Sequence, residues 1–157
     1  MNTYLNMTKN ALEKEKIRYN EFDECTIGVA FTREDDSHIN FSFRFDEETD
    51  NGKDKGNHIH LSTFVENANM KDMYSNALVL CNNLNKDYRW ARFYIDNDYD
   101  IACDADAILS ESNAGEECLE LMFRLMRIID EAAPRIKQLM EFAPSAAVPE
   151  KAATVLS

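Results

Sequence analysis

The segment from His38 to Phe45 constrains the fold of this chain more than any other. Its apolar side chains alternate strictly with polar ones, and they are Ile39, Phe41, Phe43 and Phe45. Because successive side chains of a β-strand point to opposite faces, a period of two predicts a strand with one face in a core and the other toward solvent. The chain therefore has to cover one face of a sheet with other apolar elements.

The same period recurs on both sides of this strand. The core positions are Cys25, Ile27, Val29 and Phe31 in residues 25–32, and Ile59, Leu61, Thr63 and Val65 in residues 59–65. Residues 46–57 between the second and third strands combine dense charge with two glycines, which predicts a mobile hairpin loop. In that hairpin the numbers of facing residues should sum to roughly 104. The three strands then form an antiparallel meander.

Two other segments in the first half of the chain have helical patterns. Residues 3–19 place charged, helix-favouring side chains between apolar ones, and residues 69–86 carry an apolar stripe that should pack on the sheet. Leu78 and Val79 lie off that stripe. A helix that is apolar on more than one side is usually covered on more than one side, so we expect a second surface, such as another subunit, to cover them.

A second hairpin and a long helix complete the predicted domain. Residues 88–96 and 99–108 alternate around a polar turn. The helix begins near Asn113, and Pro134 is expected to end or kink it. A further amphipathic turn or two follows, up to about residue 142.

The resulting order, α-β-β-β-α-β-β-α, contains no βαβ alternation. It predicts an α+β protein with an antiparallel sheet packed by helices. At 157 residues the chain is long enough to bury one core, so we expect a single domain over residues 1–142 that needs no disulfide or metal. Two prolines among small residues predict a disordered tail over residues 143–157.

Charge and composition exclude several classes of partner. The chain has 29 acidic against 17 basic side chains, and its net charge of −12 repels nucleic acid and anionic membranes. The N-terminal residues lack the pattern of a signal peptide, and no apolar run approaches the ~20 residues of a membrane span. We therefore expect a cytoplasmic protein. The four cysteines are widely spaced, without a C-x-x-C pair, which predicts buried thiols rather than zinc or redox chemistry.

The sequence has no catalytic or metal-binding pattern. Residues 96–100 begin like a calcium loop, but the sixth and twelfth positions of that loop carry neither the required Gly nor the Glu. His58 and His60 share one strand face, yet the third histidine, His38, should lie about 20 Å from His60. Nucleophile and phosphate-binding motifs are missing from the sequence. We therefore expect no enzymatic activity, no cofactor and no metal.

The outer face of the second hairpin is the remaining candidate site. Its outward positions are Trp90, Arg92 and Tyr94 on the first strand, with Asp100, Asp104 and Asp106 near them on the second. Aromatic and arginine side chains are favoured in protein interfaces. The alternative is that cross-strand Arg–Asp pairs and amphipathic aromatics simply cover a sheet. The predicted interface residues are Leu78, Val79, Trp90, Arg92 and Tyr94.

Three segments resemble a known family. They are Leu84–Asp96 (LNKDYRWARFYID), Asp100-Ile101 and Ile128–Pro134 (IIDEAAP). Together with the element order, they resemble the YbjN-type family of bacterial proteins over about residues 3–140. The resemblance implies a type III secretion chaperone-like fold, found in small acidic domains that commonly pair as homodimers. It carries no catalytic residue, and the long 46–57 loop and the proline-containing tail depart from it.

The functional expectation follows from these points. We expect a non-enzymatic protein-binding module, chaperone-like or a regulatory adaptor, that acts as a homodimer on a protein partner. The alternative is a small-molecule or metal-binding sensory regulator. A closed pocket with convergent polar groups would favour the alternative.

Overall fold

The computed structural model describes residues 2–46, 58–66 and 69–141. They form an α+β fold around a six-stranded antiparallel sheet of order β1-β2-β3-β4-β6-β5. The strands are β1 (Asn20–Asp23), β2 (Thr26–Thr32), β3 (His38–Phe45), β4 (His58–Glu66), β5 (Arg92–Ile95) and β6 (Ile101–Ile108). The α-helices are α1 (Thr3–Lys14), α2 (Tyr74–Asp87, after a 3-10 turn at Lys71–Met73) and α3 (Ala114–Glu141). The predicted α+β class and antiparallel sheet are confirmed.

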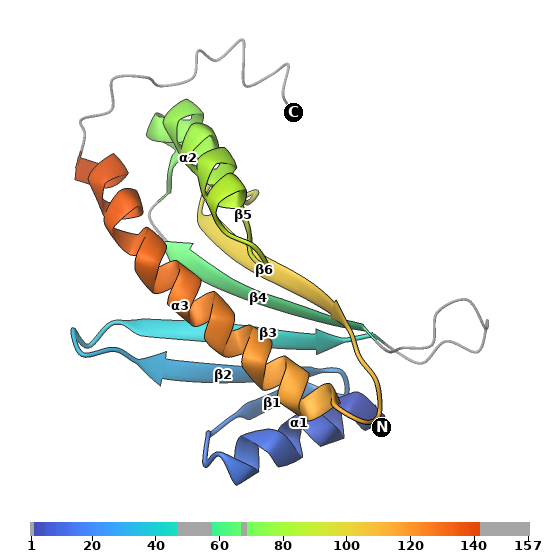
Figure 1. The fold of residues 1–157 in the computed structure, drawn as a ribbon. Helices are drawn as coiled ribbons and strands as arrows, with labels where there is room; N and C mark the ends of the chain where they lie inside the picture. The colour runs from blue at the N-terminus through green and yellow to red at the C-terminus, as the bar shows by residue number, and fades with distance from the viewer. Residues whose placement is uncertain (1, 47–57, 67–68, 142–157) are drawn as a thin grey trace.

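The helices lie together on one face of the sheet, and α3 runs across it (Figure 1). Helix α3 contacts both other helices as well as β4 and β6. Side chains from the helices join those of β2 to β6 in a single buried cluster. The fold therefore has two layers, and the helices cover one side of the sheet.

Strand β3 supplies the centre of that cluster. Its four apolar side chains are at most 3% exposed, whereas the polar side chains between them reach solvent or are half-buried. Phe41 faces Thr63 and Phe43 faces Leu61 across the β3–β4 hairpin. The register predicted from the hairpin is therefore confirmed.

Helices α1 and α3 pack closely at Gly115, in the first turn of α3. A Cβ atom at this position would lie 2.7 Å from the carbonyl oxygen of Met7 and 2.9 Å from Cβ of Ala11. The absence of a side chain at residue 115 thus allows the two helices to pack backbone against backbone.

The N-terminal region differs from the prediction. Helix α1 ends at Lys14 instead of near Tyr19, because Lys16 adopts a left-handed conformation with φ of 57°. The chain then forms β1, which pairs with β2 and was not predicted. All four residues of β1 are exposed, so this strand has no buried face and no alternation that a sequence pattern could reveal.

Pro134 was expected to end or kink the last helix. Helix α3 continues through it to Glu141, so the proline does not end the helix, and a kink there stays a prediction. A proline here removes the bond that its N–H would donate to the carbonyl of Asp130. Ala132 and Ile136, on either side of it, are nonetheless buried, and this packing offsets the lost bond. The predicted mobile loop, residues 46–57, lies outside the described residues after Asp46, and so does the predicted disordered tail. None of the described helices has the length and apolar character needed to cross a membrane.

Candidate functional site

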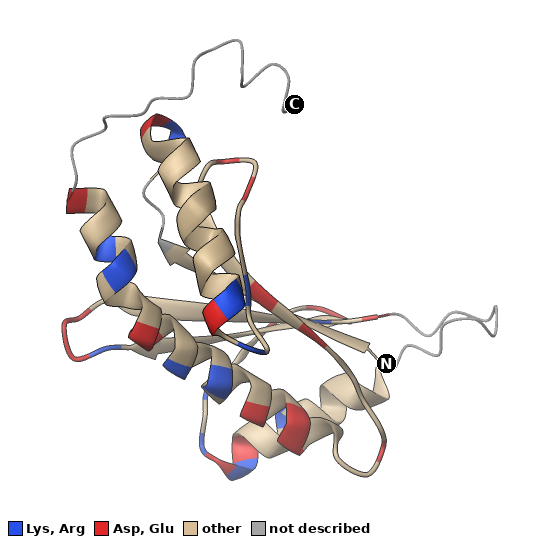
Figure 2. Cartoon of the chain, turned by 45° about the horizontal axis from the view of Figure 1, so that its top comes forward, with Lys and Arg blue, Asp and Glu red and all other residues tan. Residues whose placement is uncertain are grey.

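The sheet face that points away from the helices is the first candidate site, and we call it the open face. On the other side of the sheet, helix α3 carries interspersed charges of both signs (Figure 2). Besides Ile108 at the end of β6, three of the exposed large apolar residues of the described chain belong to the open face. They are Phe22, Phe64 and Tyr94, with 67%, 56% and 36% of their surface exposed.

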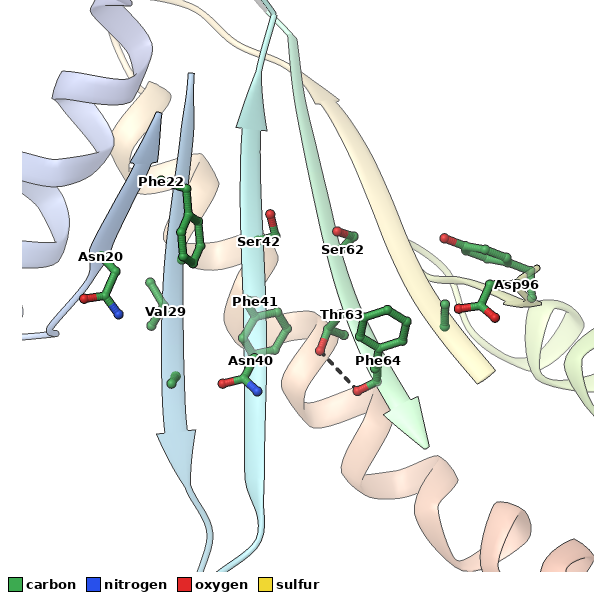
Figure 3. Close-up of a pocket in the computed structure, with 14 residues that line it drawn as sticks. Asn20, Phe22, Val29, Asn40, Phe41, Ser42, Ser62, Thr63, Phe64 and Asp96 are labelled. Carbon is green, nitrogen blue, oxygen red and sulfur yellow. Dashed lines mark hydrogen bonds between the residues drawn. The ribbon is translucent and has the colours of Figure 1, made fainter. Parts of the chain in front are cut away.

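Small side chains line the middle of the open face. Asn20 faces Gly28, Gly28 faces Ser42, and Ser42 faces Ser62, so that one row crosses four strands. Ala30 and Ala102 lie beside this row, and together these residues leave a hollow of about 360 Å³. We call this hollow the trough (Figure 3).

Aromatic rings form the sides of the trough. Phe22 stands on one side and Phe64 on the other, with Ser42 and Ser62 between them (Figure 3). The ring of Phe22 covers Gly28 so closely that a Cβ atom there would lie 2.5 Å from it. Gly28 therefore determines where the ring of Phe22 can lie. The lining contains one carboxylate, Asp96, and no basic side chain.

A charged cluster occupies the open face beside the trough. The guanidinium of Arg92 donates from Nε to Asp104, at 2.7 Å, and from a terminal nitrogen to Asp106, at 3.3 Å. His60 Nδ1 lies 2.6 Å from the same Asp106 carboxylate. Hydrogen bonding to Asp104 raises the pKa of Arg92 above its usual value, and burial followed by the charge of Asp104 raises the pKa of Tyr94. Because these charges are paired with one another, the cluster fixes side chains of β4, β5 and β6 relative to each other.

The predicted interface residues of the second hairpin are only partly brought together. Arg92 and Tyr94 lie on the open face beside Asp104, as expected. Trp90 does not, because β5 begins at Arg92 and the φ of 73° at Trp90 turns the chain away from the strand. Its ring instead lies 5.8 Å from the guanidinium of Arg124 on α3.

Asp100, the third aspartate expected near these residues, is also placed elsewhere. It lies in the β5–β6 turn, where its amide donates to the carboxylate of Asp96 at 3.0 Å. The turn thus explains the acidic segment that resembled the start of a calcium loop.

Leu78 and Val79 form a second apolar surface, on α2. Leu78 is 39% exposed and Val79 is 60% exposed, whereas Ala77, Cys81 and Leu84 of the same helix are buried. The apolar stripe predicted for this helix is therefore confirmed. An interface at Leu78 and Val79 stays a prediction.

The histidines pair with protein groups. His58 lies 3.2 Å from Asp46, and His60 is part of the charged cluster. His38 lies at the other end of the sheet, where its ring contacts Thr32. Within the described ranges, no group of three or more His, Cys, Asp or Glu side chains is arranged to hold a metal ion.

The thiols are buried as predicted, apart from Cys25, which is half-buried. Burial raises the pKa of Cys81 to about 11, and that of Cys103 and of Cys118 to about 12. A nucleophilic cysteine requires a lowered pKa, because the thiolate is the reactive form. These three thiols are therefore structural.

Sequence patterns missed the aromatic sides of the trough. Phe22 lies on the unpredicted β1, so no pattern placed it. Phe64, however, is an apolar residue at an outward position between Thr63 and Val65, and this break in the alternation is a signal of an unusual outer face.

Comparisons with known proteins do not establish a family for this chain. No family model and no curated protein matches the chain. The chain is similar to a solved structure of the Yersinia pestis type III secretion chaperone SycH in complex with a stable fragment of YscM2. Identity is 12% and the TM-score is 0.49, over 83% of this chain and 98% of that chain. At this level the similarity carries no argument about function, and membership of the YbjN-type family stays a prediction.

Proposed function

We propose that this chain is a non-enzymatic protein-binding module of the cytosol, a chaperone-like or regulatory adaptor that holds a segment of another protein in the trough. One observation carries the proposal. The open face exposes Phe22, Phe64 and Tyr94 around a floor of small residues. Soluble proteins rarely expose large apolar side chains in a group unless the group binds something.

The shape and polarity of the trough support a protein segment as its occupant. Small floor residues between aromatic sides leave room for the apolar side chains of a bound segment, and aromatic residues are enriched where protein partners meet. The trough lies on an open sheet face, and a single carboxylate lines it. A small-molecule site would usually enclose its ligand and converge several polar groups on it.

A small-molecule sensory regulator is the second candidate, and one observation favours it. The volume of the trough, about 360 Å³, falls within the range of ligand pockets. The two candidates differ in the size of what they bind. A crosslinker placed at the margin of the trough forms a covalent product with a bound protein. If the trough binds only a small molecule, no crosslinked protein is formed.

Homodimerisation belongs to the same proposal, through Leu78 and Val79 of α2. A dimer that covers these side chains would bury apolar surface that the described residues leave exposed. Light scattering coupled to size exclusion tests this step. We expect a dimer whose mass falls to that of a monomer in Val79→Asp, and a monomeric unmodified chain would contradict it.

Site-specific photo-crosslinking tests the trough. A photoreactive residue at Asn40, at the margin of the trough, should crosslink to a discrete protein in native cytosol, which is then purified and rebound. Phe64→Asp should abolish the product, because it places a charge at the apolar side. Phe123→Asp, which changes an exposed phenylalanine of α3, is the matched control and should leave it unchanged.

Two outcomes would overturn the proposal. One is crosslinking at Asn40 no stronger than at an exposed position of α3 such as Glu116. The other is a product that persists in both Phe64→Asp and Phe22→Asp, which would show that binding does not use the aromatic sides of the trough.

A further inference from the structure

The edge of β6 is incompletely paired on the side of β5. Strand β5 faces Ile101–Asp104 of β6, and no strand of the described chain faces Ala105–Ile108 on that side. The other side of this segment pairs with β4 up to Ile108. We propose that this free edge, Ala105–Ile108, accepts a strand from a partner protein whose side chains alternate between basic and apolar.

Backbone groups provide the first part of the site. In an antiparallel ladder every second residue directs both its N–H and its C=O to the same neighbour. Two of the four residues in Ala105–Ile108 therefore present both groups to the free side. In the described chain no loop residue donates to or accepts from them. Such an edge is a template for pairing with another strand.

The side chains at this edge do not protect it. Natural edges are usually blocked by charged side chains, most often lysine, by a proline or by a bulge. The one charged side chain of this edge, Asp106, points to the open face and is paired with His60 and Arg92. Here the strand ends with Ile108, which is 75% exposed, after the small side chains of Ala105 and Ala107. Trp90, 64% exposed, lies close to Ala107 and Ile108. These three residues line a second hollow, of about 840 Å³, between β6 and α3. An aromatic side chain next to an unpaired strand is a typical anchor for a bound peptide.

The charge of the hollow indicates the chemistry of the partner. The carboxylates that line it are Asp46, Asp106, Glu117 and Glu120, against one arginine and one histidine. Arg124 is paired with Glu120 at 2.6 Å, and His58 lies beside Asp46. Asp106 also contacts His60 and Arg92, but Arg92 is shared with Asp104. Carboxylates therefore still outnumber arginines around the hollow, and this excess attracts basic side chains. A second copy of this chain would bring the same carboxylates together, so the occupant is a different protein.

The register of β6 assigns a preference to each position of the partner strand. Asp106 and Ile108 point to the open face, so the residue opposite Asp106 is basic and the one opposite Ile108 is apolar. Ala107 points to the helix side, where a large apolar side chain opposite it enters the hollow toward Leu121. This site rests on the proposed function, protein binding, but uses a surface distinct from the trough.

Tryptophan fluorescence tests the proposal directly, because Trp90 is the single tryptophan of the chain. The probe is a short synthetic peptide of alternating lysine and valine. We expect a saturable blue shift of the emission as the peptide covers Trp90. Two control peptides have the same sequence but carry methyl groups on alternate backbone nitrogens, one on the odd and one on the even positions. One of the two should lose binding, because it lacks the N–H groups that the ladder uses. A glutamate–valine peptide should not bind.

Variants of the edge locate the binding. Ile108→Lys places a charge on the exposed edge and should abolish the shift, and circular dichroism should show an unchanged fold. Glu117→Lys should weaken binding roughly threefold, the size expected for an exposed charge contact. Phe64→Ser, in the trough, is the matched control and should leave the affinity unchanged.

Each contrary outcome has a separate meaning. Equal binding of the unmodified and both methylated peptides would overturn strand addition. Binding that survives Ile108→Lys but is lost in Phe64→Ser would overturn the edge site while supporting the trough. A solution mass that falls to the monomer in Ile108→Lys would show that a second copy occupies the edge, and would overturn the choice of partner.

Discussion

The two faces of the sheet are built from the same strands and differ in almost every physical respect. On β3, Phe41 and Phe43 lie in the core, while Ser42 between them forms part of the floor of the trough. The face under the helices is filled with large side chains that contact one another. The open face has small residues in its centre and large ones at its rim. Alternation thus determines which face is the core, but side-chain volume determines whether the other face can bind anything.

The contrast extends to charge. The covered face contains apolar and thiol side chains, whereas the open face carries Arg92, His60, Asp104 and Asp106 in a paired cluster next to an apolar trough. A surface that combines an apolar hollow with ordered charges can recognise a partner by shape and by electrostatics. A sheet covered only for solubility would need neither.

The largest expected effect comes from truncating the covered face. Phe43→Ala removes a fully buried ring and should lower the free energy of unfolding by about 3–5 kcal/mol. Ser42→Ala, one residue away on the open face, should change it by less than about 0.5 kcal/mol. Urea denaturation followed by circular dichroism measures both. Similar losses for the two variants would mean that the open face is covered in solution.

The two glycines at close contacts should respond differently. Gly115→Ala places a Cβ against the backbone of Met7, which cannot move without shifting α1, and should cost about 1–3 kcal/mol. Gly28→Ala meets only the end of the Phe22 ring, which can rotate away, so its cost should be smaller. Thermal unfolding compares them. If Gly28→Ala proves the more costly, the ring of Phe22 is held more firmly than its 67% exposure indicates.

Most of the fold could be predicted because its strands have one buried face. The alternation in β2, β3, β4 and β6 set their positions, and the hairpin between β3 and β4 set their register. Strand β1 could not be predicted, because none of its residues is buried. The end of α1 depends on the left-handed conformation of Lys16, for which a lysine gives no signal. Pro134 does not end α3, because packing on both sides of it outweighs its local preference, and the alternative of a kink stays a prediction.

The candidate site was less predictable than the fold. Arg92 and Tyr94 followed from alternation, but Trp90 did not, because the strand begins only after it. The floor of the trough forms when Gly28, Ser42 and Ser62 align across three strands. Their individual polarity says only that they face outward. The trough can be inferred only when strand register and side-chain volume are considered together.

Alkaline pH should lower the free energy of unfolding, because the covered face contains buried thiols. Burial raises the pKa of Cys103 from its ordinary value of 9.0 to about 12, so the folded state holds this proton more tightly than the unfolded state. The contribution of the Cys103 thiol to the free energy of unfolding is therefore complete below its pKa in the unfolded state. It is lost as the pH rises toward the pKa of the folded state, by roughly 1 kcal/mol per pH unit. Urea denaturation across this range should give a shallower pH dependence for Cys103→Ala than for the unmodified chain.

A residue without a titratable group provides the control for that experiment. Ser42→Ala should leave the pH dependence of the free energy of unfolding unchanged. Parallel pH profiles for the unmodified chain and Cys103→Ala would contradict the expected burial of the Cys103 thiol.

The smallest expected effects distinguish an ordered charge pair from an ordinary surface pair. Arg92 and Asp104 are 2.7 Å apart; the side chain of Arg92 is 59% exposed, but that of Asp104 is only 5% exposed. Arg124 and Glu120 are 2.6 Å apart, with side chains 43% and 56% exposed. Double-mutant cycles with Arg92→Met and Asp104→Asn should give a coupling energy of about 1 kcal/mol, against about 0.3–0.5 kcal/mol for Arg124→Met and Glu120→Gln. High salt should remove most of the second coupling and less of the first, because water and ions screen exposed charges more strongly. Equal couplings with equal salt dependence would mean that the cluster on the open face is ordinary surface charge and contributes no fixed geometry to a binding site.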